Sequence, residues 1–163
     1  MNLLEAFNEL NNLYESLEVF DYDKFDKLLT NTKIDNPRFN KAQFEKHYDN
    51  KHKFYCLVED NTLLAAASIW VNKLNLNDLY INEIQTCQKG YGKKLINELL
   101  NNKNIWLMAE PGNEKLIEYY KQFNLNEFIL NKDESIYEVD TYYFYKDLDK
   151  QKFEEAIRRI YGK

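Results

Sequence analysis

Apolar residues recur at helical spacing from the start of the chain. A set of five follows steps of three and four residues, which puts all of them on one helix face: Leu3, Phe7, Leu10, Tyr14 and Leu17. The same segment carries acidic residues among its leucines and no basic cluster before them. It therefore predicts an amphipathic first helix and not a secretion signal.

Two more short helices are predicted before residue 53, one over about 23–29 and one after Asn40. A break separates them, because the residue before Pro37 avoids the helical region. Asn40 is suited to cap the second helix. The side chains expected to face inward are Phe25, Leu28, Leu29, Phe44 and Tyr48. Residues 1–53 are thus predicted to be helical.

From Lys53 onward the pattern changes to short apolar runs typical of strands. Strands are predicted over 54–59, 63–71, 79–85, 105–109, 128–130 and 137–145, with a tight hairpin turn at Asp60-Asn61. Helices are predicted over 95–100, 113–124 and 150–161. Asn124 is expected to end the second of these, because asparagine tolerates a left-handed backbone. The order predicts an α/β (α+β) fold with a mixed sheet, and 163 residues favour one domain.

A strand, a turn and a helix follow one another between residues 81 and 96. The turn holds Gly90 and Gly92, two of only four glycines in the chain. Amide groups and the positive dipole end at a helix start attract anions, and glycine lets a diphosphate approach the main chain. Positive charge is added by Lys89, Lys93 and Lys94. The segment predicts an anion site, with a ligand-free turn as the alternative; its spacing matches neither a P-loop nor a full dinucleotide fingerprint.

This segment resembles the acyl-CoA loop of the GNAT superfamily of N-acetyltransferases. That loop reads Arg/Gln-x-x-Gly-x-Gly/Ala between a strand and a helix, and Gly90 and Gly92 match its two small positions. The residue at the Arg/Gln position of the motif is Cys87 in this chain, and a glutamine, Gln88, follows one position later. Residues 113–125 are similar to a second family motif, Asn-x-x-Ala-x-x-Phe-Tyr-x-x-x-Gly-Phe. The resemblance covers 54–148, whereas 1–53 fit poorly, because the family usually opens with a strand.

The resemblance implies a single GNAT-like domain over 1–163. Its parts would be a helical N-terminal part on the acceptor side (1–53), a core (54–148) and a C-terminal helix (149–163). The implied fold is a central, mostly antiparallel sheet flanked by helices, with one splayed pair of parallel strands. In this family the pantetheine arm of the cofactor lies between those two strands, here 84–86 and 105–109.

The activity that the resemblance implies is transfer of an acetyl group from acetyl-CoA, the co-substrate, to an amine by direct attack. The implied cofactor-binding residues are Ile84, Gln85, Thr86, Gln88, Lys89, Gly90, Tyr91, Gly92, Lys93, Asn113 and Tyr120. Tyr120 matches the tyrosine that protonates the leaving sulfur, and packing in the core is its alternative. Asn113 matches a cofactor contact, and an ordinary helix N-cap is its alternative.

Glu83 is the candidate general base. It is the only acid in the 79–85 strand, and many family members carry a glutamate there. Strand alternation puts Glu83 and Gln85 on one face and Asn82 and Ile84 on the other. Glu110, at the end of the next strand, is the second candidate, and a solvated acid on the strand surface is the alternative for Glu83.

Charge and composition narrow the partners and the location. The net charge of −5 favours a cationic partner over the phosphate backbone of a nucleic acid. No apolar run approaches the roughly 20 residues that span a bilayer, so a cytoplasmic location without membrane contact is expected. Two cysteines are too few for a disulfide framework or a zinc site, and no metal is expected. A homodimer is among the partners that the resemblance implies, but no residue pattern decides it.

Other functions stay open. The main alternative is an acyl-CoA-binding GNAT fold that does no chemistry and acts as a regulatory or interaction protein. A toxin-like acetylation of aminoacyl-tRNA would call for a basic surface. A hydrolase built on Cys87 lacks a partner, because His47 and His52 fall in the helical N-terminal part. The acceptor is equally open between a polyamine, an aminoglycoside, an amino acid and a protein amine.

Overall fold

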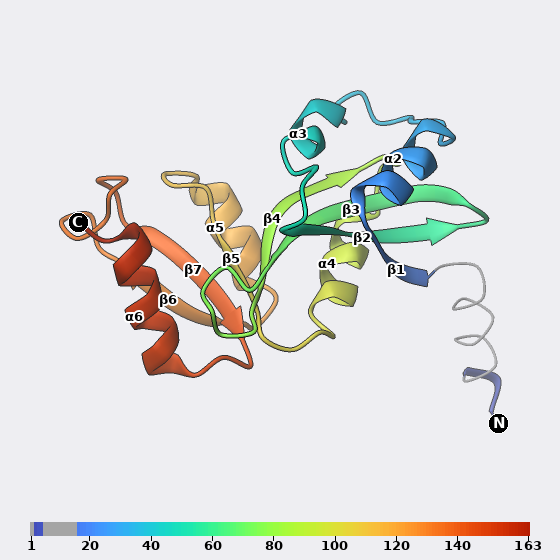
Figure 1. Ribbon diagram of the computed structural model, residues 1–163. Coiled ribbons are helices and arrows are strands. Elements are labelled where there is room, and N and C mark those ends of the chain that lie inside the picture. The colour runs from blue at the N-terminus through green and yellow to red at the C-terminus, as the bar shows by residue number, and fades with distance from the viewer. Residues whose placement is uncertain (1, 5–15) are drawn as a thin grey trace. The chain divides into compact units, whose positions relative to one another are not determined.

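The computed structural model describes residues 2–4 and 16–163, and within them seven strands and five helices (Figure 1). The strands form a mixed sheet in the order β1-β2-β3-β4-β5-β7-β6. In chain order the elements are β1 (Ser16–Phe20), α2 (Tyr22–Thr30), α3 (Lys41–Glu45), β2 (His52–Glu59), β3 (Thr62–Val71), β4 (Leu79–Thr86), α4 (Gly92–Leu99), β5 (Ile105–Met108), α5 (Glu114–Lys121), β6 (Asn126–Leu130), β7 (Thr141–Lys146) and α6 (Lys150–Tyr161). The predicted mixed α/β fold is confirmed.

The chain folds into two compact units. The first comprises Met1–Ile69 and Asn82–Leu99, and the second comprises Trp70–Ile81 and Leu100–Lys163. The described part of the chain, 2–4 and 16–163, contains no helix long and apolar enough to cross a membrane.

Strand β1 corrects the prediction for the N-terminal part. Leu17, expected on a helix face, lies in this strand opposite Leu57 of the antiparallel β2. Of the other positions of the predicted helix face, Leu3 is exposed, and Phe7, Leu10 and Tyr14 lie outside the described residues. Val19 and Phe20 are residue types that favour a strand. Pairing with β2 supplies the backbone hydrogen bonds of β1, and the spacing of apolar residues along the chain does not predict this pairing. Residues 16–20, predicted to be helical, are therefore a strand of the sheet.

The core of the first unit lies under α2 and α3. Asp21 caps α2 and Asn40 caps α3, each through a side-chain oxygen that accepts a backbone N–H. Phe25 of α2 stacks on Phe54 of β2 with ring centroids 4.2 Å apart, and Phe44 of α3 packs edge-on against Phe25. The predicted cap at Asn40 is confirmed, as are the inward faces of α2 and of α3 at Phe44. Tyr48, predicted on the same helix as Phe44, packs against this core from beyond the end of α3 at Glu45.

The hairpin between β2 and β3 is the one that the sequence predicts. Asp60 and Asn61 have φ values of 48° and 60°, the left-handed backbone of a two-residue hairpin turn. Beyond the turn, the alanines of β3 are fully buried. On α4, the apolar face predicted from spacing is buried at Leu95, Ile96 and Leu99.

The second unit is built on β5 and β7. The first residues of β4 pair in parallel with β5, Leu79 opposite Ile105 and Tyr80 opposite Trp106, and β4 then continues to Thr86. Strands β5 and β6 both pair antiparallel with β7. The core here is aromatic, with Trp106 packed edge-on against Phe153 of α6 at 5.7 Å between ring centroids.

Two boundaries in the second unit differ from the prediction. Helix α5 ends at Lys121, three residues early, although Asn124 does adopt the expected left-handed backbone with a φ of 56°. Strand β7 begins only at Thr141, because residues 131–138 form a hydrogen-bonded turn in which Asn131 accepts from the amides of Glu134 and Ser135.

Candidate functional site

The predicted anion site is the loop between β4 and α4 in the first unit. The amides of Cys87 and Gln88 both donate to the carbonyl oxygen of Leu64, at 2.9 and 3.2 Å, and so fix the start of the loop to β3. Gly90 has a φ of +94°, a conformation that side chains other than glycine rarely adopt. No atom lies within 4 Å of the position that a Cβ on Gly90 would take, so the main chain is accessible there.

Helix α4 begins at Gly92, and its first turn is positively charged. The amide of Leu95 donates to the carbonyl of Tyr91 at 2.9 Å. The amides of Gly92 and Lys93 come before this hydrogen bond, at the helix start where amides have no acceptor within the helix. This first turn, described in full, contains Lys93 and Lys94 and no acidic residue. Glycine main chain, a helix start and lysines together fit the diphosphate of a nucleotide such as that of coenzyme A.

The end of β4 holds a segment of the N-terminal part that the sequence did not predict to lie there. Asn36 Nδ2 donates to the carbonyl oxygen of Thr86 at 2.8 Å and to Thr86 Oγ1 at 2.9 Å. The side chain of Gln85 accepts from the amide of Asn40 at 2.6 Å and donates to the carbonyl of Asn40 at 2.9 Å. Part of the strand assigned to the pantetheine arm is thus already bonded within the first unit.

Cys87, at the position where the family loop carries Arg or Gln, is a buried core residue. Its carbonyl oxygen accepts from the amides of Asp35 and Asn36, both at 3.1 Å. Burial, and then the charge of Asp35, raise the pKa of the Cys87 thiol to about 12. The thiol is therefore protonated at neutral pH, which argues against a nucleophilic role.

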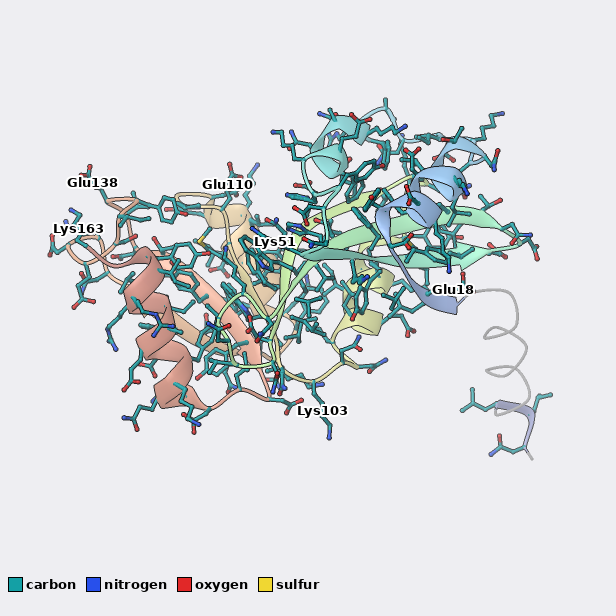
Figure 2. The ribbon with its side chains drawn as sticks, viewed as in Figure 1. Glu18, Lys51, Lys103, Glu110, Glu138 and Lys163 are labelled. Carbon is teal, nitrogen blue, oxygen red and sulfur yellow. The ribbon has the colours of Figure 1, made fainter. Side chains whose placement is uncertain are left out.

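Glu83 is half-buried in β4. Burial raises the pKa of its carboxyl, while a hydrogen bond from Gln85 and the charge of Lys46 act in the opposite direction. Glu110, the second candidate base, is exposed on the stretch between β5 and α5 (labelled in Figure 2) and its Oε2 accepts from Asn113 Nδ2 at 3.1 Å. Of the two carboxyls, only that of Glu83 is shielded from solvent, which is the environment that suits a general base.

Side chains of β4 near Glu83 bond to the segment that carries α3. Asn82 bonds to His47 just after α3, and Gln85 bonds to Asn40 just before α3. Both side chains thus reach the segment that carries α3, although they lie three positions apart in the strand. The hydrogen bond between the side chains of Gln85 and Glu83, two positions apart, is consistent with the face predicted for that pair. The surroundings of Glu83 also include Lys46, whose charge lowers the pKa of the Glu83 carboxyl. Lys46 was not associated with Glu83 from the sequence.

Asn113 and Tyr120 belong to the second unit. Asn113 is the N-cap of α5, because its Oδ1 accepts from the amide of Leu116 at 3.1 Å. Tyr120 is half-buried in the last turn of α5, with its ring 5.8 Å from that of Phe144 and 5.6 Å from that of Tyr119. The capping role of Asn113 and the packing of the Tyr120 ring are therefore both present.

Sequence and structure comparisons connect the chain to acetyltransferases. The family model described as "Acetyltransferase (GNAT) domain, PanZ" matches residues 15–134, which include β1. Mutant forms of the spermidine/spermine N-acetyltransferase SpeG from Vibrio cholerae share the fold at a TM-score of 0.50 and 16% identity, over 86% of this chain and 98% of that chain. No curated protein matches this chain in sequence.

Two further solved structures are similar at lower scores. The N-acetyltransferase PseH from Campylobacter jejuni, in complex with acetyl coenzyme A, has a TM-score of 0.47 at 16% identity, over 80% of this chain and 96% of that chain. Naa50 from Arabidopsis thaliana, in complex with a bisubstrate analogue, has a TM-score of 0.48 at 17% identity, over 82% of this chain and 98% of that chain.

Proposed function

Because this chain belongs to the PanZ group of GNAT acetyltransferase domains, we propose that it transfers an acetyl group from acetyl-CoA to an amine. The observation that carries the proposal is the loop between β4 and α4. A left-handed Gly90, a helix that begins at Gly92 and a positively charged first turn support the proposal that the phosphates of the co-substrate bind here.

The residues proposed to hold acetyl-CoA lie mainly in this loop. The amides of Gly90, Tyr91 and Gly92 would bind the diphosphate, with Gln88, Lys89 and Lys93 around it. The main chain of Ile84, Gln85 and Thr86 would bind the pantetheine arm as an added strand would. When bound, acetyl-CoA supplies a thioester whose carbonyl carbon accepts the amine.

Glu83 is proposed to accept the proton of the attacking amine. An aliphatic amine with a pKa near 10 is almost wholly protonated at neutral pH, so a proton must leave before attack. Partial burial raises the pKa of Glu83, which makes its carboxylate a stronger base than an exposed one. Its negative charge also favours a cationic acceptor. Glu110 is exposed and bonded to Asn113, so it is the weaker candidate.

Tyr120 is proposed to donate a proton to the departing sulfur. A phenol with a reference pKa near 10 can protonate a thiolate only when the two groups are held in position. The ring of Tyr120 is fixed by its contacts with Phe144 and Tyr119, which restrict the positions that its hydroxyl can take. Asn113 is proposed as a further cofactor contact through its Nδ2, which also donates to Glu110.

A second candidate function is acyl-CoA binding without transfer, in a regulatory or interaction protein. One observation favours it: the loop position that carries Arg or Gln in the family is the buried Cys87, whose carbonyl is used to hold residues 35–36. The two functions differ in turnover and not in binding, so calorimetry with acetyl-CoA must be paired with an assay of CoA release.

Glu83→Gln tests the base. The change keeps the size of the side chain and removes its basicity, so kcat/KM should fall at neutral pH and recover in part at alkaline pH, where more of the amine is already unprotonated. The profile of kcat/KM against pH should be measured for the parent, Glu83→Gln and Glu110→Gln. A Glu83→Gln profile identical to the parent's, with an altered Glu110→Gln profile, would move the role to Glu110.

A further inference from the structure

The side chain of Gln85, two positions after Glu83 in β4, bonds to main-chain groups just before α3. Its Oε1 accepts from the amide of Asn40 at 2.6 Å, and its Nε2 donates to the carbonyl oxygen of Asn40 at 2.9 Å. A backbone N–H can only donate and a carbonyl oxygen can only accept. The two contacts therefore fix the orientation of the Gln85 amide, because exchange of its oxygen and nitrogen would break both.

The same amide reaches the carboxyl of Glu83. The side chains of Gln85 and Glu83 are joined by a hydrogen bond. An amide nitrogen carries two hydrogens, and Asn40 accepts only one of them, so the second is available for a carboxylate, which can only accept. One half-buried amide group thus connects the carboxyl of Glu83 to the main chain of Asn40.

Asn40 is itself fixed in place. It is the N-cap of α3, and its carbonyl oxygen also accepts from the amide of Gln43 at 3.2 Å. Four residues earlier, Asn36 Nδ2 donates to the carbonyl oxygen of Thr86 at 2.8 Å and to Thr86 Oγ1 at 2.9 Å. The segment before α3 is therefore bonded to the end of β4 at two points, and Gln85 supplies one of them.

Two groups oppose the effect of burial on Glu83. Burial raises the pKa of its carboxyl, whereas the hydrogen bond from Gln85 and the charge of Lys46 lower it. Lys46 is the C-cap of the helix whose N-cap is Asn40. Gln85 thus acts on Glu83 directly and also holds the helix that carries Lys46. Because Lys46 is exposed, salt screens its charge more than it weakens the half-buried hydrogen bond.

We propose that Gln85 is a positioning residue, whose side-chain amide holds the Glu83 carboxyl and the start of α3 in one arrangement. This inference rests on the proposed function, in which Glu83 accepts the proton of the attacking amine. An unrestrained glutamate samples several rotamers, and only some of them direct an oxygen at a bound amine. The bond from Gln85 restricts this motion and occupies one lone pair of the carboxylate, so the others can still accept a proton.

The contact also affects the pH at which Glu83 can act. A hydrogen bond donated to the ionised carboxyl favours that form, so loss of the bond would raise the pKa of Glu83 further above its ordinary value. The acid limb of kcat/KM reports the base of the free enzyme, and it would then lie at higher pH. A residue that only supported the fold would change the melting temperature and leave this limb in place.

Gln85→Met tests the proposal, because methionine has a similar length and no amide. Carbon-13 NMR of the Glu83 carboxyl, assigned by its absence in Glu83→Gln, should be followed against pH at high salt, where the charge of Lys46 is screened. The midpoint should lie at higher pH than in the parent, and the acid limb of kcat/KM should move with it. Well above both midpoints, kcat/KM should still be roughly tenfold lower, because the base is less well oriented. An unchanged midpoint, or a shifted midpoint beside an unchanged acid limb, would overturn the proposal.

Asn40→Ala is the control for a general weakening of α3. It removes the side chain that caps the helix and keeps the backbone N–H and carbonyl that Gln85 binds. Its melting temperature should fall, while the Glu83 midpoint stays at the parent's value. Equal midpoint shifts in Asn40→Ala and Gln85→Met would assign the effect to α3 and overturn the proposal. If no amine were acetylated at any pH, the proposed function would fall, and the NMR titration would still decide whether Gln85 holds Glu83.

Discussion

Gly92→Glu is expected to weaken acetyl-CoA binding by roughly 100-fold. Like charges about 4 Å apart repel by roughly 4 kcal/mol at an effective dielectric constant of 20. Exposure to solvent weakens this repulsion, so the expected loss of affinity is about 100-fold to 1000-fold. A Cβ on Gly92 would lie 3.5 Å from Thr86 Cγ2, an ordinary contact, so the loop can accept a side chain there. Isothermal titration calorimetry with acetyl-CoA measures the loss.

Gly92→Gln is the matched control, because it has the same size and no charge. It should bind more weakly than the parent, through steric hindrance alone, and much more tightly than Gly92→Glu. Gly90 is a less suitable position, since its φ of +94° means that any side chain would strain the backbone as well as obstruct a ligand. Unchanged affinity in Gly92→Glu, with an unchanged melting temperature, would show that the phosphates bind elsewhere.

Tyr120→Phe is expected to lower kcat by roughly 100-fold and to leave acetyl-CoA affinity nearly unchanged. The substitution removes one hydroxyl, and loss of a general acid typically reduces the rate by about 10²-fold or more. The ring contacts with Phe144 and Tyr119 are retained, so the second unit should stay folded. Single-turnover kinetics should accompany the steady-state assay, so that the chemical step is the one measured.

Tyr119→Phe is the control for this prediction. Tyr119 is the neighbouring tyrosine of α5, is also half-buried, and its ring packs against Tyr120 and Phe123. Removal of its hydroxyl should leave kcat within about twofold of the parent, because the family resemblance assigns proton transfer to Tyr120 and not to Tyr119. Equal turnover in both variants, with chemistry rate-limiting, would assign Tyr120 to packing alone.

Local signals predicted much of the fold. The cap at Asn40, the turn at Asp60-Asn61 and the left-handed Asn124 all depend on neighbours in sequence. The helix spacing that includes Leu17 misled the prediction of the first element, because that spacing runs into a strand whose partner, β2, lies about 40 residues away. Strand pairing at that separation overrides local periodicity.

Local pattern predicted the glycine loop of the candidate site, and the family resemblance predicted the roles of Glu83, Asn113 and Tyr120. The pattern Gly90-Tyr91-Gly92 before an amphipathic helix identified the loop, and its left-handed Gly90 fits that prediction. The bonds from Asn36 to Thr86 and from His47 to Asn82 join residues 50 and 35 positions apart. Asparagine and histidine at such distances carry no periodic signal, so neither of these two contacts with β4 was predicted.

Release of free CoA in the presence of amines tests the central claim most directly. Purified protein with acetyl-CoA should be offered polyamines, aminoglycosides, amino acids and peptide amines, with CoA thiol measured and the product identified by mass spectrometry. We expect at least one amine to release CoA in step with its own acetylation, and we expect Gly92→Glu to lower this release by roughly 100-fold at subsaturating acetyl-CoA. Binding of acetyl-CoA in calorimetry, with no amine raising CoA release above spontaneous hydrolysis, would contradict acetyl transfer and identify the chain as an acyl-CoA-binding protein.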